Sequence, residues 1–137
     1  MPLPHEPLPH ENVFARLGVS PIHGVGVFAI VPIPQGTNIF ANDRVDMVWV
    51  EEAQLDRAGL APAHRALYAD FGVARDGRLG VPRNFNMLTT GWHLNEPPKG
   101  QEPNVGVTPS LEFIAVRDIA EGEELTLRYE TFSNPPS

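Results

Sequence analysis

The sequence predicts an α+β domain that is mostly β, with short strands in small sheets and one short helical insert. Runs of Val, Ile, Phe and Trp of strand length recur along the chain. Turn-forming residues separate these runs, since the 137 residues include 12 Gly and 15 Pro. A single region rich in Ala, Leu, Glu and Gln interrupts them, and strands and helices do not alternate as a parallel sheet would require.

The N-terminal part of the chain begins with a repeat. Residues 1–12 contain Pro-Leu-Pro-His-Glu twice and are expected to form an extended leader, because proline fixes φ and lacks a backbone donor. Residues 32–36 are rich in Pro and Gly and predict a turn. Strands are predicted at 13–17, 24–31, 38–41 and 45–50.

Residues 51–71 break the β pattern, because their composition favours helix. Gly59 and Pro62 are expected to divide this stretch into two pieces, with Pro62 as the first residue of the second piece. One face of the predicted helices combines residues spaced three and four apart, namely Leu60, His64, Leu67, Tyr68 and Phe71. We expect this face to pack against the sheets.

The second half of the chain returns to short strands. Residues 72–91 are expected to be irregular, with short extended segments near Leu79 and Phe85. Further strands are predicted at 104–108, 111–116 and 124–129. The domain is therefore expected to span residues 13–132, with a frayed tail at 133–137.

Composition excludes several classes of site and partner. Ten Lys and Arg are outnumbered by 17 Asp and Glu, so the net charge is −7 and direct nucleic-acid binding is not expected. Such an acidic surface can attract a basic peptide or can simply keep the protein dissolved. The absence of cysteine excludes disulfides and thiolate metal sites, and the spacing of the histidines does not favour a metal centre. No signal peptide or membrane span is apparent, and we expect a cytoplasmic protein.

The last predicted strand carries a tyrosine on an apolar face. Because side chains alternate across a strand, Leu125, Leu127 and Tyr129 are expected to share one face, and Arg128 is expected to point away from them. Taken alone, this tyrosine has a plain structural explanation as a core residue whose hydroxyl bonds to the backbone.

Two further features have structural and functional explanations. The pair Gly24 and Gly26 allows either a tight turn or close approach of the backbone to a ligand. Asn95 and Asn104 lie beside a proline-rich loop, where asparagines commonly form turns. An asparagine also offers donors and an acceptor with which to bind a polar ligand.

The order of these features resembles the SET-domain family of methyltransferases. Gly24-Val25-Gly26 lies in the first similar segment, which covers residues 22–40. Leu94-Asn95 and Pro103-Asn104-Val105 belong to the second segment, residues 94–105. The third segment covers residues 113–129, and its most specific part reads Arg-Asp-Ile-Ala-Glu-Gly-Glu-Glu-Leu-Thr.

The resemblance implies a SET-type fold, a cofactor and an active site. The C-terminal segment would thread through a preceding loop in a pseudoknot-like core, bringing Asn95 close to Tyr129. The cofactor would be S-adenosylmethionine, bound by Asn95 and by the backbone of Gly24, Val25 and Gly26. Tyr129 would match the active-site tyrosine and contact the same cofactor. The substrate would be a protein or peptide with an exposed lysine.

The sequence also departs from the family pattern. Glu96 and Pro97 stand where the family has His and Ser, and Arg128 stands where an Asp usually precedes the tyrosine. The cysteine-rich segment that follows many SET domains is absent. The substrate channel would therefore be formed by aromatic side chains, which also suit a core: Trp92, Phe85, Phe132 and Tyr68. A homodimer would supply another wall. The alternative function is a SET-like module of weak or no activity that binds the cofactor or a basic peptide.

Overall fold

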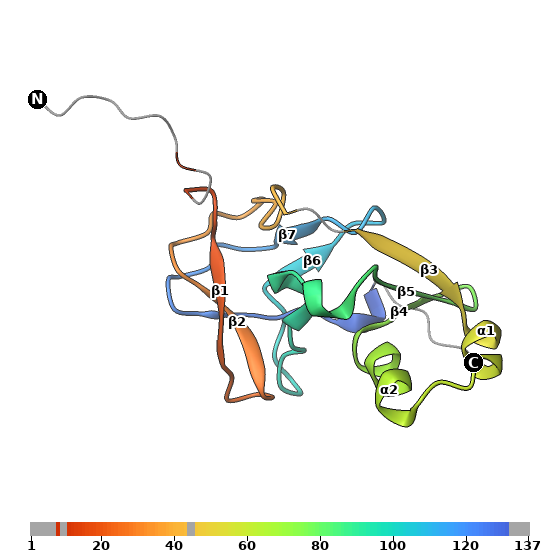
Figure 1. Ribbon diagram of the computed structural model, residues 1–137. Coiled ribbons are helices and arrows are strands. Elements are labelled where there is room, and N and C mark those ends of the chain that lie inside the picture. Colours follow the sequence, from red (N-terminus) through yellow and green to blue (C-terminus); the bar gives the residue numbers. More distant parts are fainter. Residues whose placement is uncertain (1–7, 9–10, 44–45, 132–137) are drawn as a thin grey trace, which may run out of the picture.

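The computed structural model describes residues 8, 11–43 and 46–131, so Phe132, the predicted tail and most of the predicted leader lie outside the described residues. Figure 1 shows three small sheets, with the β1–β2 hairpin at one end and the helices α1 and α2 at the other. The predicted class, a mostly β SET-type fold, is confirmed. The strands are β1 (Ala15–Val19), β2 (Val25–Ala29), β3 (Met47–Glu51), β4 (Val73–Arg75), β5 (Arg78–Pro82), β6 (Val105–Val107), β7 (Phe113–Ala115) and β8 (Glu124–Leu125).

The first sheet has the order β1-β2-β8 and contributes to the larger core. Strands β1 and β2 pair antiparallel from Ala15↔Ala29 to Val19↔Val25, and β8 pairs with the other edge of β2. Val27 and Leu125 face each other in this pairing and are completely buried. The alternation of β2 therefore directs its apolar side chains into the core, as a half-buried strand requires.

The second sheet has the order β3-β5-β4 and packs against the helical insert. Helix α1 is Glu52–Arg57 and helix α2 is Pro62–Phe71, so the predicted division and the predicted start at Pro62 are confirmed. A smaller core forms here around buried Leu55, Leu79 and Val81. None of the helices within the described part of the chain is long and apolar enough to cross a membrane.

The predicted irregular segment 72–91 contains a β-hairpin, and its strand β5 confirms the extended segment expected near Leu79. Strands β4 and β5 are joined by Asp76 and Gly77, whose φ angles of 52° and 76° are those of a type I′ turn. Phe85, which was expected in an extended segment, begins the short 3₁₀-helix η1 (Phe85–Met87). Asn84 accounts for this difference, because its side chain accepts a hydrogen bond from the Asn86 N–H at 2.8 Å and caps the turn.

The strand predicted at 38–41 is also wrong. Asn38 forms a single bridge with Ile114, and the chain then turns. The Ala41 N–H donates to the Asn38 carbonyl and the Asp43 N–H donates to the Phe40 carbonyl. These local bonds leave no continuous ladder for a strand.

The C-terminal segment passes between the two ends of the loop that joins Asn95 to β6. On one side the Leu127 N–H donates to the Asn95 carbonyl at 3.1 Å, and on the other the Val105 N–H donates to the Thr126 carbonyl at 3.0 Å. The strand predicted at 124–129 therefore ends at Leu125. The next two residues no longer pair with β2, because Thr126 binds Val105 and Leu127 binds Asn95. Tyr129 instead begins the 3₁₀-helix η3 (Tyr129–Thr131).

Candidate functional site

Asn95 lies at the centre of a buried polar cluster and is only 7% exposed. Its Nδ2 donates to the carbonyl oxygens of His23 at 3.0 Å and Val25 at 3.2 Å. Both belong to residues 20–26, here called the glycine bend, which lead from β1 into the start of β2. The same Nδ2 also donates to the Glu124 carboxylate at 3.0 Å and the Ser20 hydroxyl at 3.2 Å. The structure thus brings the glycine bend and Asn95 together, as the sequence predicted.

Asn104 holds the C-terminal segment in the same cluster. Its Nδ2 donates to the Glu124 carbonyl at 2.9 Å, and its Oδ1 accepts from the Thr126 N–H at 2.8 Å. Asn104 is 2% exposed, and these two hydrogen bonds give its buried side-chain amide the partners that a buried polar group requires. Thr126, which alternation placed on the face away from the leucines, is buried between these partners.

Tyr129 is attached to the cluster through the neighbour of Asn95. Its hydroxyl donates to the Leu94 carbonyl at 2.7 Å, and its backbone N–H donates to the Glu96 carboxylate at 2.9 Å. Burial raises the pKa of the phenol above its ordinary value of 10.0, and the negative charge of Glu96 raises that pKa further. The phenol is therefore neutral at physiological pH and acts as a hydrogen-bonding group.

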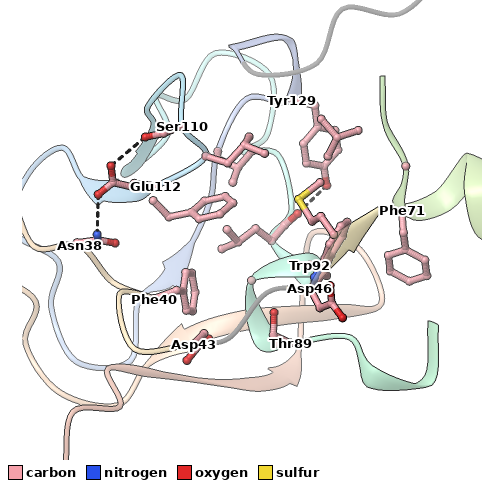
Figure 2. Close-up of a pocket in the computed structure, with 18 of the residues that line it drawn as sticks. Asn38, Phe40, Asp43, Asp46, Phe71, Thr89, Trp92, Ser110, Glu112 and Tyr129 are labelled. Atoms are coloured by element: carbon pink, nitrogen blue, oxygen red, sulfur yellow. Dashed lines mark hydrogen bonds between the residues drawn. The ribbon is translucent and has the colours of Figure 1, made fainter. Parts of the chain in front are cut away.

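The side chains of Leu94, Leu127 and Tyr129 form part of the wall of a cavity of about 770 Å³ (Figure 2). Aromatic rings from several segments complete the wall, and Figure 2 shows those of Phe40, Phe71 and Trp92 around it. The described residues that line it are Asn38, Phe40, Ala41, Asp43, Asp46, Met47, Ala69, Asp70, Phe71, Gly72, Val73, Thr89, Gly91, Trp92, Leu94, Ser110, Leu111, Glu112, Phe113, Leu127 and Tyr129.

The electrostatic character of the cavity is acidic. Four carboxylates belong to its lining, and none of the described lining residues is Lys, Arg or His. Asp46 pairs with Arg83 at 2.8 Å, and Glu112 accepts from Asn38 at 3.0 Å. Partial burial raises the pKa of the Asp43 carboxyl. Such a lining favours a cationic occupant, because opposite charges attract and aromatic faces hold cations.

The predicted channel residues have different locations. Trp92 lines the cavity, whereas Phe132 lies outside the described residues. Tyr68 and Phe85 are not in the lining and contact each other edge-to-face at 5.1 Å, where both pack against the smaller core. This part of the channel prediction does not fit the geometry, because α2 presents Tyr68 to the sheet of β3, β5 and β4.

The sequence interpretation missed most of the cavity wall. Phe40 and Phe113 stack edge-to-face at 5.8 Å, although 73 residues separate them in the chain. Phe71 was assigned to packing, yet it lines the cavity and contacts His93 at 5.7 Å. These aromatic residues lie far apart in the chain and share no sequence pattern. The sequence therefore contains no signal that they line one cavity.

The glycine bend is also not in the cavity lining. Gly26 is instead closed in by the protein, because a Cβ at this position would lie 2.9 Å from the Ser20 Cβ and against the Glu124 carboxylate. Gly24 has open space around it and a φ of +42°, which favours glycine. Glycine is therefore favoured at position 26 by the lack of space for a side chain, and at position 24 by the backbone conformation.

Three departures from the family pattern are built into the structure. Glu96 binds the Tyr129 N–H, and Pro97 is buried. Arg128 donates to the Gln101 carbonyl at 2.8 Å and so braces the long loop. Each of these residues therefore has a local structural role.

Comparisons with known proteins identify the family. The search of the curated proteins gives no match. Among solved structures, a crystal structure of a Plasmodium falciparum protein, designated a candidate histone methyltransferase, matches with a TM-score of 0.52 and 16% identity. The match covers 83% of this chain and 90% of that one, and at this identity it shows the fold alone. The model of the SET domain family matches residues 24–130, so this chain belongs to the SET-domain family.

Proposed function

We propose that this protein is an S-adenosylmethionine-dependent methyltransferase that acts on a lysine side chain of a protein substrate. The observation that carries the proposal is the convergence of the glycine bend, Asn95 and Tyr129. Hydrogen bonds join Asn95 to the bend, and the Tyr129 hydroxyl binds the residue before Asn95 at the wall of an acidic, aromatic cavity. Membership of a methyltransferase family supports the same reading.

The residues present fit the cofactor. A volume of about 770 Å³ lies in the range of small-molecule sites, roughly 300–1,000 Å³. S-adenosylmethionine carries a sulfonium and an ammonium group, which the carboxylates and aromatic rings complement. When bound, it supplies an electrophilic methyl group.

Three groups of this chain would hold that cofactor. The amide nitrogen of Asn95 carries two hydrogens that are shared among four acceptors, and no hydrogen bond among the described residues is donated to its Oδ1. This oxygen would accept from the cofactor, while the backbone of Gly24, Val25 and Gly26 would lie beside it. Neither Asn95 nor these three residues line the cavity, so a cofactor that they hold would extend beyond the cavity to reach Tyr129. Tyr129 would face the reacting end.

The cavity would prepare the lysine. A lysine has a pKa of about 10.4, and the amine must be neutral to react. Burial of the lysine side chain against Leu94, Leu127 and Trp92 would lower that pKa, by up to about 3–5 units for full burial, whereas the four carboxylates of the lining act in the opposite direction. Tyr129 would orient the amine, because its raised pKa keeps it from serving as a proton acceptor.

The proposed partner is a protein or peptide with an exposed lysine in basic surroundings. The acidic cavity lining and the net charge of −7 support this choice, because they attract positive charge and oppose nucleic acid. We also propose that the protein acts in the cytoplasm. A homodimer remains part of the proposal, as a source of a further channel wall.

One observation favours a second candidate, a binding module with little or no turnover. Glu96 occupies the position of the family histidine, and its carboxylate accepts a hydrogen bond from the Tyr129 N–H. If that replacement disables the reaction, the cavity would still bind the cofactor or a basic peptide.

Calorimetric titration with S-adenosylmethionine and with its demethylated product tests the proposal. We expect both to bind, and we expect transfer of a tritiated methyl group from the cofactor to lysines in a panel of basic proteins. Binding without transfer would favour the module. Binding of neither compound would refute both cofactor-dependent functions.

A further inference from the structure

A single carboxylate connects the elements of the proposed donor site. Glu124 Oε1 and Oε2 both lie 2.8 Å from the Ser20 hydroxyl, which donates to them, and Oε2 also accepts from Asn95. Glu124 belongs to β8, Ser20 follows β1, and Asn95 precedes the long loop. These three residues are far apart in sequence, and the carboxylate is partly buried among them.

Ser20 connects the Glu124 carboxylate to the backbone of the glycine bend. Its oxygen accepts from the Ile22 N–H at 3.0 Å and the His23 N–H at 3.3 Å, while its hydroxyl proton is directed to Glu124. The bend is therefore held by its own backbone donors at one side and by Asn95, which binds the His23 and Val25 carbonyls, at the other. Loss of the carboxylate would free Ser20 to rotate and leave Asn95 without its charged acceptor.

The backbone at Gly26 lies close to the Glu124 carboxylate. A Cβ on Gly26 would meet the Glu124 carboxylate and the Ser20 Cβ. Glycine at this site thus keeps room for Glu124, which is a separate reason from any approach of a ligand to the backbone.

We infer that Glu124 is a positioning residue of the methyl-donor site, acting through Ser20 and Asn95 to fix the glycine bend. The inference rests on the proposed function and deepens it. It concerns donor affinity, because the group touches Asn95 and the bend and does not line the cavity that holds Tyr129.

The neighbouring Glu123 supplies a matched control. It accepts from Arg117 at 2.9 Å and from the Ala120 N–H at 3.0 Å, and its carboxylate also interacts with the Asn104 side chain. Glu123 therefore shares Asn104 with the cluster, but it has no hydrogen bond to Ser20 or Asn95. Removal of Glu123 therefore tests the general cost of losing a carboxylate at this turn.

The test compares donor dissociation constants and methyl-transfer kinetics for the wild type, Glu124→Ala, Ser20→Ala, Glu124→Gln and Glu123→Ala. We expect the two alanine variants of the cluster to bind the donor about tenfold more weakly, with kcat at saturating donor unchanged within about twofold. Glu124→Gln should recover part of the affinity, because its carbonyl can still accept from Ser20. Glu123→Ala should bind as the wild type does.

Two further measurements separate positioning from general destabilisation. Hydrogen exchange at the Ile22 and His23 amides should accelerate in Glu124→Ala and in Ser20→Ala while most other core amides keep their protection. The variant that combines Glu124→Ala with Ser20→Ala should lose no more donor affinity than either single variant, because Glu124 and Ser20 act as one unit. Ser20→Ala removes one oxygen and keeps the test decisive if Glu124→Ala does not fold.

The inference is overturned if the cluster variants bind the donor like the wild type, if Glu123→Ala loses as much affinity, or if the whole effect falls on kcat. The wild-type titration distinguishes this failure from failure of the proposed function. A wild type that binds no donor refutes both, whereas normal wild-type binding with unaffected variants refutes only the role of Glu124.

Discussion

The two cores of this molecule differ in the polar groups that they bury. The larger core includes Leu94, Val105 and Leu125, which are chain neighbours of three buried polar residues, Asn95, Asn104 and Thr126; Ser20 is also buried and binds Asn95. The smaller core beneath the helices contains Leu55, Leu79 and Val81, with the Tyr68 and Phe85 rings stacked against it. Buried polar groups are costly unless each has a partner. The comparison indicates that the first region is organised by buried hydrogen bonds, and the second by apolar packing.

Substitution of the phenol at the edge of the first core should have the largest effect. Tyr129→Phe removes the hydroxyl that binds the Leu94 carbonyl and would orient the amine. We expect kcat to fall by about 10²–10³, which is the cost of removing one oriented donor in other active sites. Methyl-transfer assays measure this, and calorimetry should show retained donor binding. An unchanged kcat would remove Tyr129 from the reaction.

A pair of core substitutions should separate the two regions directly. Leu79→Ala in the smaller core should lower the free energy of unfolding by about 2–5 kcal/mol, because it leaves a cavity. Asn104→Ala in the larger core should lower it by about 1–3 kcal/mol, because the Thr126 N–H loses its acceptor. Urea unfolding measures both.

Donor binding then decides what the difference means. Folded Leu79→Ala should bind the donor like the wild type, and folded Asn104→Ala should bind it more weakly. Equal loss of affinity in both variants would show that the two cores are not functionally distinct.

The pH dependence should identify the titrating group. Between pH 7 and 9 we expect kcat/KM to rise by up to tenfold per unit, because a larger fraction of the lysine is neutral. Tyr129 should cause no decline in this range, since its folded-state pKa is raised above 10.0 and the phenol stays protonated. Any stability that the raised pKa contributes is present below pH 10 and is lost as the pH rises through the raised value. A decline in rate before pH 9 with retained folding would contradict the neutral phenol.

The smallest effect should come from the acidic part of the cavity. Asp70→Asn removes one lining carboxylate on α2 and should raise KM for a basic peptide about threefold, less at high salt. Asp56→Asn is the control, because Asp56 is exposed, pairs with Arg65 at 3.6 Å and does not line the cavity. A similar change in both variants would indicate a general effect of net charge.

Several elements followed from local sequence. Gly59 and Pro62 divided the helical insert as expected, because neither suits a helix interior. The β4–β5 hairpin was missed even though Asp76-Gly77 is a strong hairpin signal, so that error was one of interpretation. Asn95 and the glycine bend lie together, as the family resemblance implied. The acceptors of the Asn95 amide could not be predicted from the sequence.

The sequence by itself determined most of the short strands and the division of the helical insert, because these depend on residues that are neighbours along the chain. It also contained the family motif. Only the tertiary structure decided the end of the last strand at Leu125, the burial of Thr126 and the aromatic wall of Phe40, Phe71 and Phe113. The physical reason is that alternation fixes side-chain direction only while a strand keeps one partner. Here the threaded segment leaves β2 for Asn104 and then for Asn95 within a few residues.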